Sequence, residues 1–197
     1  MALAGSLKPD YVKLDYANTH RDIVEQCKRG SRKAQFELYR LYAKAMYNVC
    51  IRMVGNEQDA EDLLQGSFVD VYAHLETFRY QSTIGAWIKR IVVNNCINFL
   101  KRRRLEIEEF VPFQHDKEED EEQDPPAGLT VDAVRQALFY LPDGYRVVFS
   151  LYAMEGFDHQ EIADVLGITE ATSKSQYSRA RRKLKEILIE KRLINYF

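Results

Sequence analysis

Hydrophobic residues recur every three or four positions through most of this 197-residue chain, which is the spacing of amphipathic α-helices. In the first part of the chain, the spacing predicts helices over residues 23–30, 31–55, 57–78 and 82–104. Further helical segments follow between residues 130 and 193. No segment alternates apolar and polar residues as a half-buried β-strand does, so we predict an all-α fold.

The helical pattern fades between residues 105 and 129, where two consecutive prolines precede the next helix. Between Glu106 and Asp124 there are ten acidic residues and one lysine, a local charge of −9, whereas the whole chain has a formal net charge of −2. The rest of the chain is therefore basic, which favours polyanionic partners. We predict two small helical domains, residues 1–104 and 130–197, joined by an acidic, flexible linker at 105–129.

Cysteine and histidine positions give no sign of a metal or redox centre. Cys27, Cys50 and Cys96 lie far apart in apolar surroundings, and none belongs to a CxxC pair. The four histidines are equally scattered, and none is at metal-ligand spacing from a cysteine or carboxylate. We therefore expect no metal and no cofactor. The N-terminus lacks the features of a secretion signal, and no run approaches 18 apolar residues, so we predict a cytoplasmic protein without membrane insertion.

The segment that begins at Asp158 has the pattern of a helix, a sharp turn and a second helix. Asp158 and Glu161 resemble a capping box at the start of the first helix. Gly167 allows the positive φ of a tight turn, and Thr169 follows as the N-cap of the second helix. Residues 170–192 contain eight Lys or Arg and three Glu. The pattern predicts a basic helix-turn-helix.

A helix-turn-helix places the start of its second helix against base edges in the major groove of DNA. Hydroxyl and cationic side chains near that start can bond base edges and phosphates. The candidates are Thr172, Lys174, Ser175 and Arg179. Arg182 belongs to a later basic cluster that would hold the DNA backbone. The alternative is an ordinary solvated basic helix, but caps, turn glycine and cations coincide here and together favour DNA binding.

The helix predicted at 82–104 has a polar stripe on a different arc from its apolar face. The stripe consists of Trp87, Arg90, Asn94, Asn98 and Lys101. Asparagine is a poor residue for a helix interior because its amide competes for backbone hydrogen bonds, so two of them on one stripe indicate a partner. An aromatic ring, amides and cations in one row suit a nucleic acid whose bases are exposed.

Residues beside this stripe extend the candidate site. Ser82 and Thr83 precede the helix. Four cations end it, Lys101, Arg102, Arg103 and Arg104, where they suit phosphates and the helix dipole. Asn95 is also a candidate, although it falls on the apolar face. For Trp87 and Asn95 taken singly, a place in the core explains the sequence as well as nucleic-acid binding does, whereas nucleic-acid binding better explains the stripe as a set.

Four blocks of sequence together resemble the extracytoplasmic-function (ECF) sigma factors, the small two-domain members of the major bacterial sigma family. The blocks are GSRKAQFELYRLY, DAEDLLQGSFVDVY, the pattern FxxxSTxxxWIxRIVVN, and LPDGYRVVFSLYAMEGFDHQEIADVLGITEATSKSQYSRARRKL. They occur in the family's order and with its gap, between about residues 23 and 188.

The resemblance implies that the chain is not an enzyme. It implies instead that the chain binds core RNA polymerase, directs it to selected promoters and helps to open the DNA. The block DAEDLLQGSF is expected to dock on the clamp helices of the β′ subunit through Asp59, Asp62, Leu63, Gln65 and Phe68. The region 78–104 is expected to recognise and melt the −10 element and to capture a flipped base. The helix-turn-helix is expected to read the −35 element and to touch the β flap.

The resemblance also implies two features outside these contacts. The acidic linker matches the family's tether, which passes into the polymerase interior, where its charge could mimic the nucleic acid that it displaces. Members of the family are commonly restrained by an anti-sigma factor, often membrane-anchored, so such a partner is expected here.

Three positions depart from the family's pattern. Ser173 stands where a valine usually packs the recognition helix, so this helix is expected to sit less firmly or to pivot. Asn98 replaces a frequent aspartate, so a neutral amide stands where the family usually has a carboxylate. Gly66 replaces a common glutamate in the docking block, which weakens one expected contact and costs helix stability of about 1 kcal/mol relative to alanine.

Two other classes of protein are alternatives to a sigma factor. A stand-alone helix-turn-helix regulator that binds double-stranded operator DNA would use the C-terminal part but leave the polar stripe and the docking block without a role. A small metal-dependent enzyme would use Asp59, Glu61 and Asp62, but acidic residues are expected in the first turn of a helix in any case. The sigma-factor interpretation therefore explains more of the sequence.

Overall fold

The computed structural model describes residues 20–103 and 129–193, and all regular structure within these two ranges is helical. The first range contains α1 (Arg21–Lys28), α2 (Arg32–Val54), α3 (Glu57–His74), the 3-10 turn η2 (Leu75–Thr77) and α4 (Ile84–Arg102). The second contains α5 (Val131–Leu138), α6 (Asp143–Phe149), the π-helical turn η3 (Ser150–Met154), α7 (His159–Leu166) and α8 (Glu170–Glu190). The all-α prediction is confirmed. The predicted linker lies, except for its last residue, outside the described residues.

Polar N-caps fix the start of several helices. Ser31 Oγ accepts a hydrogen bond from the main-chain N–H three residues later at 3.3 Å, which begins α2. Thr83 Oγ1 accepts the equivalent bond at 3.1 Å. Because Thr83 is the cap, α4 begins two residues after Ser82, where the spacing predicted its start. α2 ends at Gly55, whose φ of 70° is left-handed.

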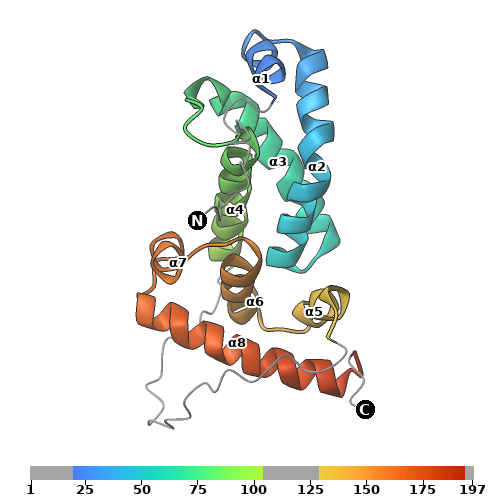
Figure 1. The fold of residues 1–197 in the computed structure, drawn as a ribbon, viewed down its shortest axis with the longest axis vertical. Coiled ribbons are helices and arrows are strands. Elements are labelled where there is room, and N and C mark those ends of the chain that lie inside the picture. Colours follow the sequence, from blue (N-terminus) through green and yellow to red (C-terminus); the bar gives the residue numbers. More distant parts are fainter. Residues whose placement is uncertain (1–19, 104–128, 194–197) are drawn as a thin grey trace, which may run out of the picture.

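Helices α2, α3 and α4 pack against one another to form the core of the N-terminal unit, and α1 packs on α2 at one end (Figure 1). The apolar face of α4 lies in this core, where Ile88, Val92 and Cys96 are fully buried. Burying apolar side chains of this size stabilises the fold by roughly 1.5–3 kcal/mol each. The polar stripe of α4 therefore lies on the other side of the helix.

In the C-terminal unit, the long helix α8 lies across α5, α6 and α7 (Figure 1). Its buried side includes Ala180, Leu184 and Leu188, which pack with Leu138 and Phe149. This packing holds the helix-turn-helix, α7 and α8, on the rest of the unit. No helix in the described part of the chain is long and apolar enough to span a bilayer.

The two units touch each other directly. The apolar cluster of the N-terminal unit continues into α6 and α7 through Val147, Leu151, Ile162 and Leu166. α6 packs on α2, and α7 packs on α4. We call this contact the interunit seam. The relative orientation of the two units, which the sequence left open, is therefore one in which the helix-turn-helix lies beside the polar stripe.

Candidate nucleic-acid interface

The predicted polar stripe exists on α4. Arg90, Asn94, Asn98 and Lys101 are all exposed, because the core holds the opposite face of the helix. Trp87 is half-buried and packs on Phe78 at a ring-centroid distance of 5.5 Å. Trp87 therefore has a partly structural role. The exposed residues of the stripe are two asparagines, one arginine and one lysine.

Asn95 is half-buried beside this surface. Its side-chain amide donates to Ser67 Oγ at 3.1 Å and to Asp70 Oδ2 at 2.7 Å. Both partners lie on α3, so Asn95 joins α4 to α3 through its side-chain NH2 group. The DNA contact of Asn95 stays a prediction, but its bonds to α3 give this half-buried polar side chain a structural role in the free chain.

The cations at the end of α4 have partners within the chain. Arg103 Nη1 lies 2.6 Å from Asp59 Oδ2, and Arg102 Nε donates to Asn98 O at 3.3 Å. The sequence had assigned Arg103 to DNA and Asp59 to polymerase, yet here they form one ion pair. The pair is solvent-accessible, so it is weak and exchangeable. Arg104 lies outside the described residues.

The loop before α4 carries the other two candidates for the −10 element. Ser82 is exposed, and its hydroxyl donates to Thr83 O at 3.4 Å. Thr83 is half-buried, and its hydroxyl oxygen is occupied as the N-cap of α4. Thr83 thus shapes the loop, while Ser82 is the member that is open to a ligand.

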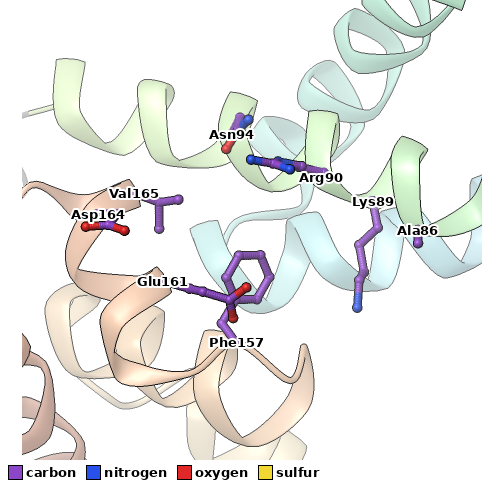
Figure 2. A pocket seen from close by; sticks show the side chains of 8 residues that line it. All are labelled: Ala86, Lys89, Arg90, Asn94, Phe157, Glu161, Asp164 and Val165. Atoms are coloured by element: carbon purple, nitrogen blue, oxygen red, sulfur yellow. The ribbon is translucent and has the colours of Figure 1, made fainter. Parts of the chain in front are cut away.

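A groove separates the stripe from the helix-turn-helix. Figure 2 shows Lys89, Arg90 and Asn94 of α4 on one side, opposite Glu161 and Asp164 of α7. The cavity between them has a volume of about 290 Å³. Basic and acidic side chains thus face each other across the groove, so α7 covers part of the stripe with groups of opposite charge.

Four polar contacts join the two units at the interunit seam around this groove. Glu155, whose side chain is only 4% exposed, pairs with Arg52 and, at 3.5 Å, with Lys89. Lys89 Nζ also donates to the main-chain oxygen of Glu155 at 2.9 Å. Lys101 Nζ donates to Val165 O of α7 at 3.1 Å. Lys101, a predicted phosphate ligand, is therefore bound to the other unit in this arrangement.

The helix-turn-helix has the predicted local geometry. Asp158 Oδ1 accepts from Glu161 N at 2.7 Å, and Glu161 Oε2 accepts from Asp158 N at 2.9 Å, which completes the capping box. Gly167 has a left-handed φ of 73°. Thr169 Oγ1 accepts from Thr172 N at 3.0 Å and caps α8. The predicted capping box, glycine turn and N-cap are all confirmed.

The predicted −35 candidates lie on the outer side of α8. Two are exposed, Lys174 and Arg182, and three are half-buried, Thr172, Ser175 and Arg179. Lys174 Nζ pairs with Glu170 Oε1 at 2.6 Å, and Ser175 Oγ donates to Thr172 O at 3.0 Å. These are local contacts between neighbouring turns of α8.

Ser173 anchors the start of α8. It is fully buried, and its hydroxyl lies 2.9 Å from His159 Nδ1. His159 in turn stacks on Tyr152, with ring centroids 4.3 Å apart. Burial, followed by the nearby Lys174, lowers the pKa of His159 below its usual value. A hydrogen bond from α7 thus holds the helix where the family's valine would give apolar packing.

The predicted polymerase-docking block lies on α3. Asp62 and Gln65 are exposed, and Leu63 and Asp59 are half-buried. Beside them is a second cavity of about 470 Å³, lined by Tyr39, Tyr47, Glu61, Leu64 and Gln65. Gly66 is exposed, and a Cβ there would meet no atom within 4 Å. The missing glutamate therefore leaves open surface within the block.

Phe68 belongs to the core instead of this surface. It is 3% exposed and packs edge-on against Tyr39, with ring centroids 4.8 Å apart. Its assignment to direct polymerase contact is corrected, because a buried ring holds α3 against α2 and has little area left for a partner.

The sequence did not indicate the residues that join the units. Arg52 and Glu155 are 103 positions apart, and Arg146 contacts residues 92 and 93 positions away. No local pattern marks such pairs.

Comparison with known proteins matches both units to one family. Sigma-70 region 2 matches residues 38–106, from within α2 past the end of α4. Sigma-70 region 4 matches residues 131–184, from the start of α5 into α8. The two regions occur in this order on either side of the predicted linker.

Individual relatives agree with this match. The ECF RNA polymerase sigma factor SigE of Mycolicibacterium smegmatis is 31% identical over 157 residues, which is 77% of this chain and 60% of that relative. The chain thus spans less than two thirds of SigE. The ECF RNA polymerase sigma factor EcfG of Rhodopseudomonas palustris is 30% identical over 138 residues, 70% of this chain and 76% of EcfG.

A solved structure supports the same conclusion. The sigma factor RpoE, in complex with the anti-sigma factor NepR from Bartonella quintana, is 25% identical with a TM-score of 0.50, and the match covers 77% of this chain and 94% of RpoE. Together with the two matched regions and the ECF relatives, this likeness shows that the chain belongs to the ECF sigma factors of the Sigma-70 family.

Proposed function

We propose that this chain binds core RNA polymerase and directs it to specific promoters. The −10 element would be read by α4 and the loop before it, and the −35 element by the start of α8. One observation supports this most: each matched sigma region presents a helix with exposed cations and polar side chains on the side away from its core. Two such surfaces suit two separate stretches of promoter DNA.

Polymerase docking is assigned to α3. Asp62 and Gln65 are exposed there, Leu63 offers apolar area, and an open cavity lies alongside. This surface faces away from the core and does not use the polar stripe, so the chain could hold the β′ clamp helices and DNA at the same time. A contact of the C-terminal unit with the β flap follows from the family resemblance alone.

The interunit seam suggests how the free chain differs from the bound one. α7 stands across a groove from Arg90 and Asn94, and Lys101 is bonded to α7. Promoter DNA can reach the whole stripe only if α7 moves away from α4. Polymerase docking would therefore have to separate the two units.

An anti-sigma factor is the proposed regulator. RpoE, the similar solved structure, is in complex with the anti-sigma factor NepR. By this likeness, we propose that an anti-sigma factor binds the present chain and restrains it. A membrane anchor on such a partner remains a prediction from the resemblance.

The alternatives are weaker. A stand-alone operator-binding regulator has no use for the N-terminal unit, whereas Sigma-70 region 2 matches residues 38–106 of that unit. Sigma factors are transcription initiation factors and not enzymes, and of the three carboxylates considered for an enzyme, Asp59 is bound to Arg103.

Multi-round transcription with purified core polymerase on a genomic promoter library tests the proposal. We expect the chain to associate with core enzyme, to produce discrete new start sites, and to bind duplex DNA poorly when alone. If core polymerase neither binds the chain nor changes its start sites, the proposal is wrong. Tight binding of the chain alone to duplex DNA would support an operator-binding regulator.

A further inference from the structure

Tyr80 has an unusual backbone for its position. Its φ is 59°, and in the described ranges only two other non-glycine residues, His20 and Arg192, have a positive φ. Those two lie at the outer ends of the described ranges, whereas Tyr80 lies inside the loop between η2 and α4. A bulky residue in the left-handed region is strained, and such strain persists only where surrounding contacts hold it.

The side chain of Tyr80 has those contacts, and α1 provides them. The phenol donates to Glu25 Oε1 at 2.5 Å. Arg21 Cζ lies 4.7 Å and Lys28 Nζ 4.9 Å from the centre of the Tyr80 ring, which are cation–π distances. Burial, with the hydrogen bond to Glu25, raises the pKa of Tyr80 to about 12, so the phenol stays protonated and remains a donor.

The main chain of the loop is held from the same helix. Lys28 Nζ donates to Phe78 O at 3.3 Å and pairs with Glu25 Oε1 at 3.3 Å. Phe78 is 3% exposed and packs on Tyr80 at 4.8 Å and on Trp87 at 5.5 Å between ring centroids. One side of α1 is thus linked through the loop to the first turn of α4. We call Arg21, Glu25, Lys28 and Tyr80 the loop clamp.

We propose that Tyr80 is a positioning residue for the −10 element, fixed by Glu25 and by two cations of α1, and that the loop clamp sets the conformation in which the loop meets a flipped base. The inference rests on the proposed function, because it assigns a task to the loop that carries Ser82 and Thr83. It adds Arg21, Glu25 and Lys28 of α1, which lie outside the predicted site and act on the −10 element only through Tyr80.

The physical reason is the cost of ordering a loop. A loop that must present side chains to a base pays for its own immobilisation on binding unless it is already held in the bound conformation. The loop clamp supplies this order in the free protein, through a charge-assisted hydrogen bond, two cation–π contacts and a bond to the main chain. Loss of the clamp should therefore weaken discrimination among −10 sequences more than it weakens the fold.

The test compares Tyr80→Phe with Tyr72→Phe. Each variant deletes one hydroxyl with a known partner; Tyr72 donates to Gln35 O at 2.7 Å, on α2 and away from the loop. Full-length variants with core polymerase are assayed on a promoter that the wild-type chain opens and on versions with single −10 substitutions. Permanganate reactivity of unpaired thymines gives the rate of opening, and the ratio between promoters measures discrimination.

We expect Tyr80→Phe to lower this ratio about tenfold, the size of one lost hydrogen bond to a charged group, with unchanged affinity for core polymerase. Tyr72→Phe should leave the ratio unchanged. Hydrogen exchange at the amides of residues 79–83 in the free chain should become faster in Tyr80→Phe only. Glu25→Gln, which keeps an acceptor, should preserve more discrimination than Glu25→Ala.

Three results would overturn the inference. Equal ratios for Tyr80→Phe and Tyr72→Phe, or unchanged loop exchange in Tyr80→Phe, would show that the clamp does not position the loop while the proposed function stands. A wild-type chain that opens no promoter would refute the proposed function, and the inference with it.

Discussion

Arg146 of α6 donates a hydrogen bond to the main-chain oxygen of Val54, the last residue of α2, at 3.2 Å. The same guanidinium reaches Met53 O at 3.4 Å and Leu141 O at 3.1 Å. The last carbonyls of an α-helix have no partner within the helix, so an arginine of one unit completes the end of a helix in the other. Gly55 makes room for it, since a Cβ there would lie 2.8 Å from the guanidinium carbon.

Arg146→Met is expected to lower the free energy of unfolding by about 3 kcal/mol, because it leaves buried carbonyls without donors. Urea unfolding of the full chain measures the change. Arg135→Met is the control: its ion pair with Asp132 is exposed, so about 0.5 kcal/mol or less is expected. Equal effects of the two variants would contradict a structural role for the buried guanidinium.

Glu155→Gln should open the interunit seam. Its carboxylate is buried between Arg52 and Lys89, and the variant leaves these cations without their anion at the contact. Single-molecule energy transfer between fluorophores on α3 and α8 should report a larger population with separated units. Glu186→Gln removes an exposed ion pair with Lys183 and should leave the distance between the fluorophores unchanged. If Glu155→Gln also leaves this distance unchanged, apolar packing alone holds the seam.

Substitutions at Asn95 and Asn98 should have different effects, the first on protein stability and the second on the rate of promoter opening. Asn95→Ala loses the bonds to Ser67 and Asp70 and should cost about 1–2 kcal/mol of stability, with little effect on opening beyond the loss of folded protein. Asn98→Ala removes an exposed side chain and should leave stability within about 0.5 kcal/mol while slowing opening. Thermal unfolding and permanganate footprinting measure the two effects. The reverse pattern would assign Asn95 to the DNA-binding surface.

Protonation of His159 should weaken the C-terminal unit. Burial and the nearby Lys174 lower its pKa from the usual 6.5, against the opposite influence of Glu170 and Asp158. The unfolded chain then takes up the proton first, so stability falls as pH drops below about 6.5 and the loss is complete only below the pKa of the folded state.

The measurement is urea unfolding of the full chain between about pH 7.5 and pH 5. His159→Gln should flatten this part of the profile, because the group whose pKa differs between folded and unfolded chains is gone. His74→Gln, at an exposed position on α3, should keep the slope of the wild type. A wild-type slope in His159→Gln would assign the effect to other groups.

Replacing Lys174 and Arg179 with alanine should reduce recognition of the −35 element. If both contact phosphates, the slope of log affinity against log salt should fall by about 2. Lys33→Ala, on the exposed side of α2, should leave both measurements unchanged. Promoter selection that is indifferent to the double variant would remove these residues from the −35 site.

The sequence determined the local features of this protein. Ser31 and Thr169 cap helices at the starts that the sequence predicts, and Gly55 and Gly167 end helices, whereas the cap role of Thr83 was not predicted. These outcomes depend on bonds between residues three or four positions apart and on the φ that glycine allows, so spacing alone is enough to predict them. The exposed polar stripe on α4 was likewise predicted from the helical spacing of its residues.

Tertiary structure decided what each polar or aromatic side chain touches. Phe68 is buried, the amide of Asn95 bonds to α3, and Arg103 pairs with Asp59. Tyr80 bonds to Glu25, which lies 55 positions earlier in the chain. The same is true of the interunit seam. Such contacts depend on how whole helices pack, because the energy of a buried charge or amide is set by partners that the chain brings in from far along its length.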